Sequence, residues 1–159
     1  MIKENINDFF NDTKRIGPFL GIDLGEKRVG LSISDRTQSI ASNYMTLEKK
    51  KFSLFSLDLQ AIIDKEIICG IVIGLPLNMD GSEGPKCQST RDFAKNFSKI
   101  VSLPITFWDE RLTTVAAERS LLSADLSRKK RKRVVDSVAA VLILQNLLDR
   151  MKNIQQKNT

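Results

Sequence analysis

Residues 18–34 read PFLGIDLGEKRVGLSIS, and this stretch decides the fold class. The apolar run that ends at Asp23 and the alternation of apolar with small or polar residues over 28–34 are both typical of β-strands. The short turn 25–27 joins them, so the stretch predicts an antiparallel hairpin. A third strand is expected over 39–47.

The remaining chain switches between helical and strand patterns. Helices are predicted over 50–65, 93–100, 114–122 and a buried stretch at 134–150, and strands over 67–73 and 104–108. Strands that alternate with helices form parallel β-α-β units with right-handed crossovers. We therefore expect an α/β fold with a mixed five-stranded sheet, three antiparallel strands followed by parallel units, flanked by helices.

The length of 159 residues suits one domain. We expect an N-terminal arm over 1–16, loosely held or forming a short helix, a domain over 17–150 and a C-terminal tail over 151–159. No apolar stretch approaches the ~18–20 residues of a membrane span, and the N-terminus lacks the apolar core of a signal peptide. Two cysteines fit a reducing compartment, so a cytoplasmic location is expected.

The charge balance points to a polyanionic partner. Lysine and arginine total 25 against 19 acidic residues, a net charge of +6, which plain solubility explains equally well. The chain has no histidine, which excludes Ser-His-Asp triads, histidine-ligated zinc and Cys-His proteases. Hydrolytic chemistry would have to use carboxylates, lysine or a metal held by oxygen atoms.

Acidic residues stand where strands of an α/β sheet end and ligands gather. Asp23 ends an apolar strand, where it either serves chemistry or accepts hydrogen bonds from the turn amides that follow. Asp109 and Glu110 end the later strand, and one of them can instead pair with Arg111. The residues alone leave both alternatives open.

Asp136 continues the apolar stripe of the last helix, formed by Ala139, Ala140, Ile143 and Leu147. The helix dipole explains an acid in the first turn, but not one on the buried face. Acids that converge from three elements repel unless a cation lies between them. Oxygen ligands suit Mg²⁺ or Mn²⁺. Two such ions close together can activate a water and stabilise the leaving oxygen when a phosphodiester is hydrolysed.

Basic and glycine-containing segments are candidates for phosphate contact. The candidate nucleic-acid contacts are Lys27, Arg28, Arg111, Arg128, Lys129, Lys130, Arg131, Lys132 and Arg133; a solvated loop is the alternative for 128–133. The loop 75–85 carries Asn78, Asp80, Gly81 and Gly84, whose backbone amides are expected to be free for a substrate phosphate, unless the loop is a plain connector. One Trp and one Tyr are too few to predict a base-stacking platform.

Four segments together resemble the YqgF family of pre-16S rRNA nucleases, also described as Holliday-junction-resolvase-like. They are GIDLGEKRVGLSISD (21–35), IVIGLPLNMDGSEGP (71–85), FWDERLTT (107–114) and LSRKKRKRVVDSVAAVLILQNLLD (126–149), in family order within 19–150. The resemblance implies a ribonuclease H-like fold, a cytoplasmic bacterial protein and a nuclease that matures the 5′ end of the 16S rRNA precursor. RNA within a pre-ribosomal particle would then be the partner.

The same resemblance places the family's acidic residues on Asp23, Glu110 and Asp136, which selects Glu110 over Asp109 as catalytic residue and metal ligand. The N-terminal arm departs from the family pattern. Two alternatives remain: a resolvase that cuts branched DNA as a homodimer, and a non-catalytic RNA-binding assembly factor. A monomer is equally compatible with the nuclease. An actin-type ATPase is disfavoured because it needs two lobes.

Overall fold

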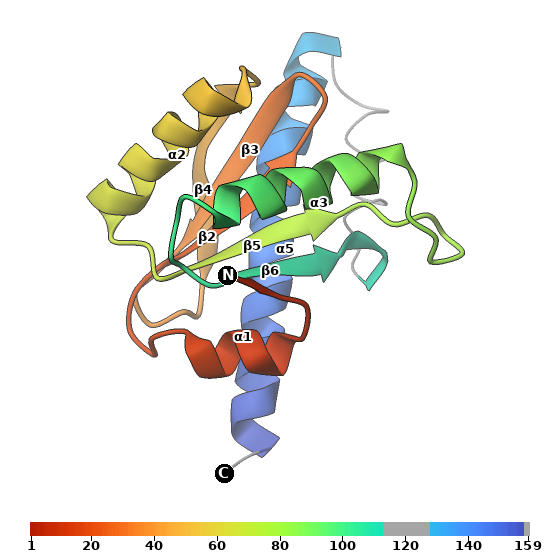
Figure 1. Cartoon of the computed structure of the whole chain (residues 1–159). Helices are drawn as coiled ribbons and strands as arrows, with labels where there is room; N and C mark the ends of the chain where they lie inside the picture. Colours follow the sequence, from red (N-terminus) through yellow and green to blue (C-terminus); the bar gives the residue numbers. More distant parts are fainter. Residues whose placement is uncertain (113–127, 158–159) are drawn as a thin grey trace.

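The computed structural model describes residues 1–112 and 128–157; of 128–137 it gives the helix but no side-chain environment. Within these residues one sheet has six strands in the order β1-β6-β5-β2-β3-β4 (Figure 1). The strands are β1 (Ile2–Lys3), β2 (Phe19–Leu24), β3 (Arg28–Ser34), β4 (Ala41–Glu48), β5 (Gly70–Leu75) and β6 (Ile105–Asp109). The helices are α1 (Ile6–Asp12), α2 (Phe52–Glu66), α3 (Pro85–Ser98), the 3₁₀ helix η1 (Glu110–Leu112) and α5 (Arg128–Lys157).

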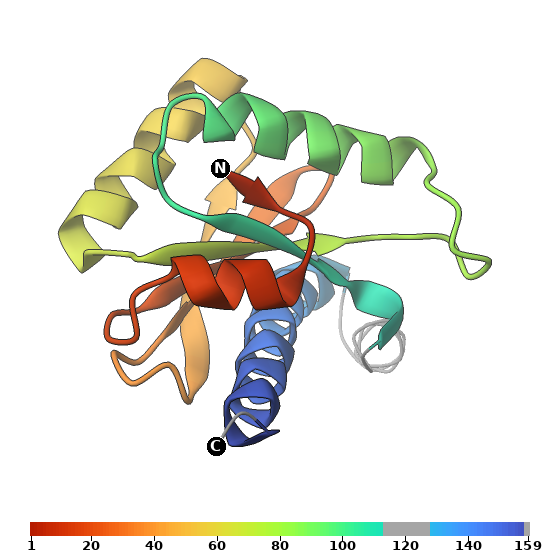
Figure 2. The same cartoon turned by 60° about the horizontal axis from the view of Figure 1, so that its bottom comes forward.

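The sheet is antiparallel on one side and parallel on the other. Strands β2, β3 and β4 pair antiparallel, whereas β2, β5, β6 and β1 pair parallel. Helices α2 and α3 cover one face of the sheet, and α1 and α5 cover the other (Figure 2). The predicted α/β fold with a mixed sheet and its N-terminal hairpin is therefore confirmed.

The predicted number of five strands is wrong, because the N-terminal arm adds a sixth. Ile2 and Lys3 pair in parallel with Ile105 and Thr106 at the edge of the sheet. The expectation of a loosely held arm is also wrong, although its short helix is present as α1. Phe9 is fully buried, and its ring lies 5.5 Å from that of Phe19. Apolar burial therefore fixes a segment whose composition is mostly polar.

Replacing Phe9 by Ala should lower the free energy of unfolding by about 3–5 kcal/mol, because the substitution empties a fully buried site. Urea denaturation followed by circular dichroism measures this change. Met79, which is 90% exposed, offers the control, and its replacement by Ala should change stability by less than about 0.5 kcal/mol. Equal effects of the two substitutions would show that the arm is only loosely attached.

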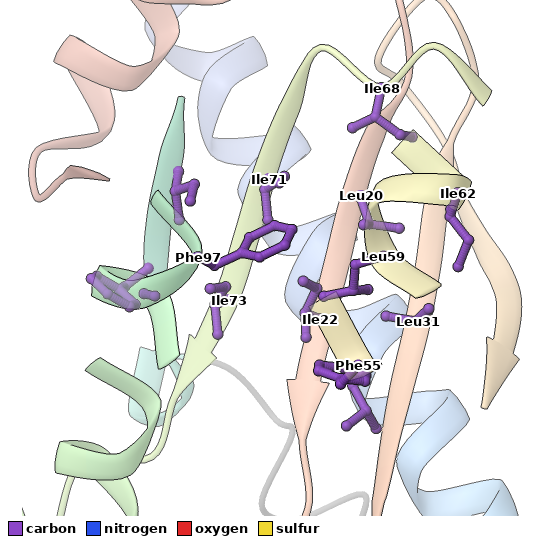
Figure 3. Packing of buried hydrophobic residues seen from close by; sticks show 14 of the residues in the cluster. Leu20, Ile22, Leu31, Phe55, Leu59, Ile62, Ile68, Ile71, Ile73 and Phe97 are labelled. Atoms are coloured by element: carbon purple, nitrogen blue, oxygen red, sulfur yellow. The ribbon is translucent and has the colours of Figure 1, made fainter. Parts of the chain in front are cut away.

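The two faces of the sheet contact separate clusters of buried side chains, because alternate residues of a strand point to opposite faces. Side chains of Leu20, Ile22, Ile71 and Ile73 pack with Phe55, Leu59 and Phe97 from α2 and α3 (Figure 3). On the other face, Phe19 and Val72 pack with Phe9 of α1 and with Ile143, Leu144 and Leu147 of α5.

Helix α5 is longer than predicted at both ends. It begins in the basic run at Arg128 and continues to Lys157, and Met151 beyond the predicted end is buried. The basic run is thus helical rather than a loop, while the helix predicted at 114–122 lies outside the described residues. The Ser32 hydroxyl donates to the Ala140 carbonyl at 2.6 Å, which holds α5 against β3.

No helix in the described part of the chain is long and apolar enough to cross a membrane.

The two cysteines should resist alkylation. Burial and the neighbouring Glu83 raise the pKa of the Cys87 thiol to about 11, and burial also raises the pKa of Cys69. Iodoacetamide at pH 8 should therefore label neither residue in the folded protein and both after unfolding, as read by mass spectrometry. Because only the unfolded thiol of Cys87 ionises from pH 9 upward, stability should fall as pH rises from 9 to 11. Rapid native labelling at pH 8 would contradict this assignment.

Candidate functional site

Asp23 lies near the carboxyl end of β2 and is only 5% exposed. Its neighbours fix the direction of its side chain. Ile22 belongs to the core under α2 and α3, whereas a Cβ atom added at Gly21 would lie 2.9 Å from Leu144 Cβ and 3.1 Å from the Ala140 carbonyl oxygen of α5. Since the residues of a strand alternate, Asp23 points to the same face as Gly21. A buried carboxylate is thereby placed on the α5 side of the sheet.

Glu110 is the first residue of η1, directly after β6, and is 8% exposed. The parallel registers bring its strand close to Asp23. Ile22 pairs with Ile73, so that the next residues along the two strands are Asp23 and Gly74, and Gly74 in turn pairs with Trp108. Asp23, near the carboxyl end of β2, and Glu110, directly after β6, therefore lie at the same edge of the sheet with only β5 between their strands.

Gly74 leaves the space into which Glu110 extends. A Cβ atom at Gly74 would lie 2.8 Å from Glu110 Oε1 and would overlap the Cδ1 atom of Ile143. Asp23, Gly74 and Glu110 line one cleft. Sequence reasoning missed Gly74, although a glycine inside an otherwise β-branched strand signals a close approach of other atoms.

Asp136, the third predicted acid, lies in α5 one helical turn before Ala140. Its side chain is outside the part of the chain that the structure describes, so its convergence with the other two acids stays a prediction. The hydrogen bond from Ser32 to the Ala140 carbonyl fixes the helix one turn further along.

Asp109 and Glu110 have different environments although they are adjacent. Arg111 binds the Asp109 carboxylate through two nitrogens, with Nη2 at 2.7 Å from Oδ2 and Nε at 3.1 Å from Oδ1. This bidentate contact with the guanidinium lowers the pKa of Asp109. Arg111, predicted to contact nucleic acid, thus holds Asp109, and its Nη1 lies 3.5 Å from the carbonyl oxygen of Met79.

The loop after β5 is closed by its own hydrogen bonds. Asn78 Nδ2 donates to Ser82 Oγ at 2.9 Å, and the amide of Gly81 donates to the Asn78 carbonyl at 2.9 Å. The amide of Ser82 donates to the Asp80 carboxylate at 2.9 Å. The amide of Asn78 also donates, to the Ser82 carbonyl at 3.0 Å, so the expectation of free amides is wrong for Asn78 and Gly81. Gly81 has a φ of 88°, which favours glycine, and Gly84 is the N-cap of α3.

Of the cationic residues predicted to contact nucleic acid, the structure describes the side chains of Lys27 and Arg28 but not those of 128–133. Lys27 is exposed in the hairpin turn, and Arg28 is half-buried at the start of β3. The Nη1 atom of Arg28 is buried, and no acceptor among the described residues lies within hydrogen-bond distance of it. A buried guanidinium nitrogen without a hydrogen bond is uncommon, and an anionic oxygen or a bound water is the kind of partner that would satisfy it. The side chains of 128–133 lie outside the described residues.

The described acids suit a hard divalent cation. Asp23 and Glu110 supply carboxylate oxygens at low exposure from separate strands, which is the donor chemistry that Mg²⁺ and Mn²⁺ require. Among the side chains that the structure describes, which exclude Asp136, no group of three or more acidic or cysteine residues has the geometry of a metal site. The two acids fit a metal site that needs a further ligand.

The order and directions of the strands, with buried acids at the ends of β2 and β6, define a ribonuclease H-like fold. The solved structure of Thermus thermophilus RuvC in complex with a Holliday junction substrate has this fold. It matches with a TM-score of 0.53 at 10% sequence identity, over 86% of this chain and 96% of that one.

The chain belongs to the RuvX family, described as "Holliday junction resolvase", whose sequence pattern matches residues 17–150. Curated relatives match almost the whole chain. A protein of Ruegeria pomeroyi is 51% identical over 97% of this chain and 100% of its own length, and one of Rhodobacter capsulatus is 52% identical over 97% of each. Both carry the name "Putative pre-16S rRNA nuclease", and the resemblance drawn from the sequence is thus confirmed.

Proposed function

We propose that this protein is a metal-dependent nuclease, a hydrolase of phosphodiester bonds, that processes the 5′ end of pre-16S rRNA in the bacterial cytoplasm. Relatives about half identical to this chain, matched over 97–100% of their own length, carry the words "pre-16S rRNA nuclease" in their names. The observation that carries the proposal is the pair of buried acids, Asp23 and Glu110, which line one cleft, with Glu110 extending into the space that Gly74 leaves.

Asp23 and Glu110 would hold one or two Mg²⁺ or Mn²⁺ ions, with Asp136 as the third ligand. The bound metal would activate water and stabilise charge on the phosphate in the transition state. The protein contributes the orientation of the ligands. Gly74 leaves room for the Glu110 carboxylate, and the hydrogen bond between Ser32 and Ala140 fixes the register of α5, which carries Asp136.

Cationic side chains would hold the RNA backbone beside these carboxylates. Arg28 presents a buried guanidinium nitrogen that has no acceptor within the described part of the chain, and Lys27 is exposed in the preceding turn. The six cations of 128–133 begin α5 and precede Asp136 by a few residues. Each phosphate that they neutralise would add about 0.7–0.9 to the slope of log affinity against log salt.

Cleavage of branched DNA is the second candidate, because the family description names a Holliday junction resolvase. A resolvase needs two active sites on opposing strands and hence a dimer. A non-catalytic assembly factor would bind RNA without needing the carboxylates.

The test compares two labelled substrates, an RNA that spans the precursor 5′ end and a four-way DNA junction, each with Mg²⁺, with Mn²⁺ and with EDTA. We expect metal-dependent cleavage of the RNA. Asp64→Asn, at an exposed position on α2, serves as a control for the preparation and should cleave like wild type. Cleavage of the junction alone would establish the resolvase, and binding of RNA without cleavage would establish the assembly factor.

A further inference from the structure

The cleft that contains the two acids is larger than a metal site needs. It has a volume of about 670 Å³ and runs from Asp23, Gly74 and Glu110 past the hairpin turn to the facing sides of α2 and α3. A metal held by Asp23 and Glu110 would occupy only the end of the cleft at these two residues. The remaining space has the size of a small-molecule pocket. Its lining includes phenylalanines and lysines and so differs from the acidic end of the cleft.

Phenylalanine rings form the wall of the cleft away from the carboxylates. Phe52 at the start of α2 is 37% exposed, and its ring meets that of Phe93 from α3 edge to face at 5.8 Å. Phe93 is backed by Phe97, whose ring stacks on it at 5.6 Å, and by Phe55 at 5.6 Å. Phe55 and Phe97 are buried and hold the ring of Phe93 in place. Phe52, Phe55 and Phe93 line the cleft.

Lys49 and Lys86 line the same cleft as the two acids and the phenylalanines. The amide of Lys49 donates to the Lys27 carbonyl at 2.9 Å, and the Lys49 ammonium donates to the Gly25 carbonyl at 3.2 Å, which ties Lys49 to the hairpin turn after Asp23. Lys86, at the start of α3, also lines the cleft and forms an exposed pair with Glu26 at 3.5 Å. An exposed pair of this kind contributes little energy. An ammonium group has three N–H donors, so Lys49 can bind a phosphate while it donates to the Gly25 carbonyl.

We propose that Phe52 and Phe93 bind one unstacked nucleobase of the strand being cut, while Lys49 and Lys86 contact the adjoining phosphate. The inference rests on the proposed nuclease function, because Asp23 and Glu110 of that site also line this cleft. An aromatic wall, flanking cations and a volume suited to one nucleotide are the features by which proteins bind single-stranded nucleic acid. The site would select an unpaired nucleotide beside the scissile phosphate.

The test measures binding without cleavage, in EDTA, with short single-stranded RNA that carries one abasic position moved along the strand. Phe52→Ala should weaken binding of intact RNA about tenfold, because it removes a stacking partner. Leu54→Ala is the matched control, since Leu54 lies two residues further along α2, is 53% exposed and does not line the cleft. It should bind like wild type.

An abasic site at one position should weaken RNA binding by the wild-type protein about tenfold. The same abasic RNA should weaken binding by Phe52→Ala by less than about twofold, because this variant already lacks the ring that contacts the base. Phe52→Tyr should restore binding, and Phe52→Leu, which keeps apolar packing but lacks a ring, should bind like Phe52→Ala. If Phe52→Ala unfolds, Phe52→Leu replaces it. The inference would be overturned if the losses of affinity caused by the abasic site and by Phe52→Ala multiplied in combination. It would also be overturned if Phe52→Ala and Leu54→Ala bound RNA equally well, or if the wild-type protein bound no RNA.

Failure of this inference differs from failure of the nuclease proposal. If wild type and Phe52→Ala cleave the precursor RNA equally well and bind it with equal affinity, the nuclease proposal stands and the base-binding site is rejected. If RNA binding depends on Phe52 but neither wild type nor any variant cleaves RNA with either metal, the base-binding site stands and the nuclease proposal is rejected.

Discussion

Glu110→Gln is expected to reduce metal-dependent cleavage of the precursor RNA at least about a hundredfold. Gln has nearly the same shape as Glu, but it lacks the negative charge that holds the cation. A bound cation stabilises the transition state of phosphodiester hydrolysis by several kcal/mol. The rate under single-turnover conditions measures the effect. RNA affinity in EDTA should stay within about threefold of wild type, because the substitution removes an anion and no RNA contact.

Asp109→Asn is the matched control for this prediction. Asp109 is the adjacent acid, but its carboxylate binds Arg111 and is less buried than that of Glu110. Its loss breaks a partly exposed ion pair, which typically contributes about 0.2–1 kcal/mol. Cleavage should therefore fall less than about tenfold. If the two variants lose activity equally, or if only Asp109→Asn does, the assignment of Glu110 is wrong.

Gly74→Ala should reduce cleavage about a hundredfold, which is the second large effect. The added Cβ would lie 2.8 Å from Glu110 Oε1, so the carboxylate has to move. A displacement of about 1 Å at a reacting group can lower a rate about a hundredfold. The same Cβ overlaps Ile143, and overpacking of this kind lowers stability by about 1–3 kcal/mol.

The double variant Gly74→Ala/Ile143→Val separates these two effects. Val lacks the Cδ1 atom that the new Cβ would overlap, so urea denaturation should show part of the lost stability recovered. Cleavage should stay low, because the conflict with Glu110 remains. Recovery of activity together with stability would show that Gly74 serves packing and not the position of the carboxylate.

Local pattern was sufficient to predict most of the sheet and its central acid. The alternation over 28–34 and the apolar run before Asp23 depend only on neighbouring residues, and they correspond to β3 and β2. Asp23 near the end of β2, and the two acids at the end of β6, could be named for the same reason, since the ends of strands are visible in the sequence. Glu110 could not be separated from Asp109 by residues alone, because the Arg111 contact that distinguishes them depends on how the chain turns after β6.

Features created by contacts between distant segments were not predictable. The polar arm gains its strand only because Ile2 and Lys3 meet Ile105 and Thr106, about a hundred residues later. The count of Trp and Tyr predicted no stacking surface, yet α2 and α3 bring phenylalanines together across the cleft. The role of Gly74 likewise depends on the approach of η1 and α5 to β5.

The most direct test of the account is the anomalous scattering of Mn²⁺ in crystals of the wild-type protein. The central claim is that Asp23 and Glu110 hold the metal on which cleavage depends. We expect a peak at about 2.0–2.2 Å from a carboxylate oxygen of each, the range for small divalent cations, with Asp136 completing the site. Manganese bound elsewhere, in a protein that still cleaves with Mn²⁺, would contradict it.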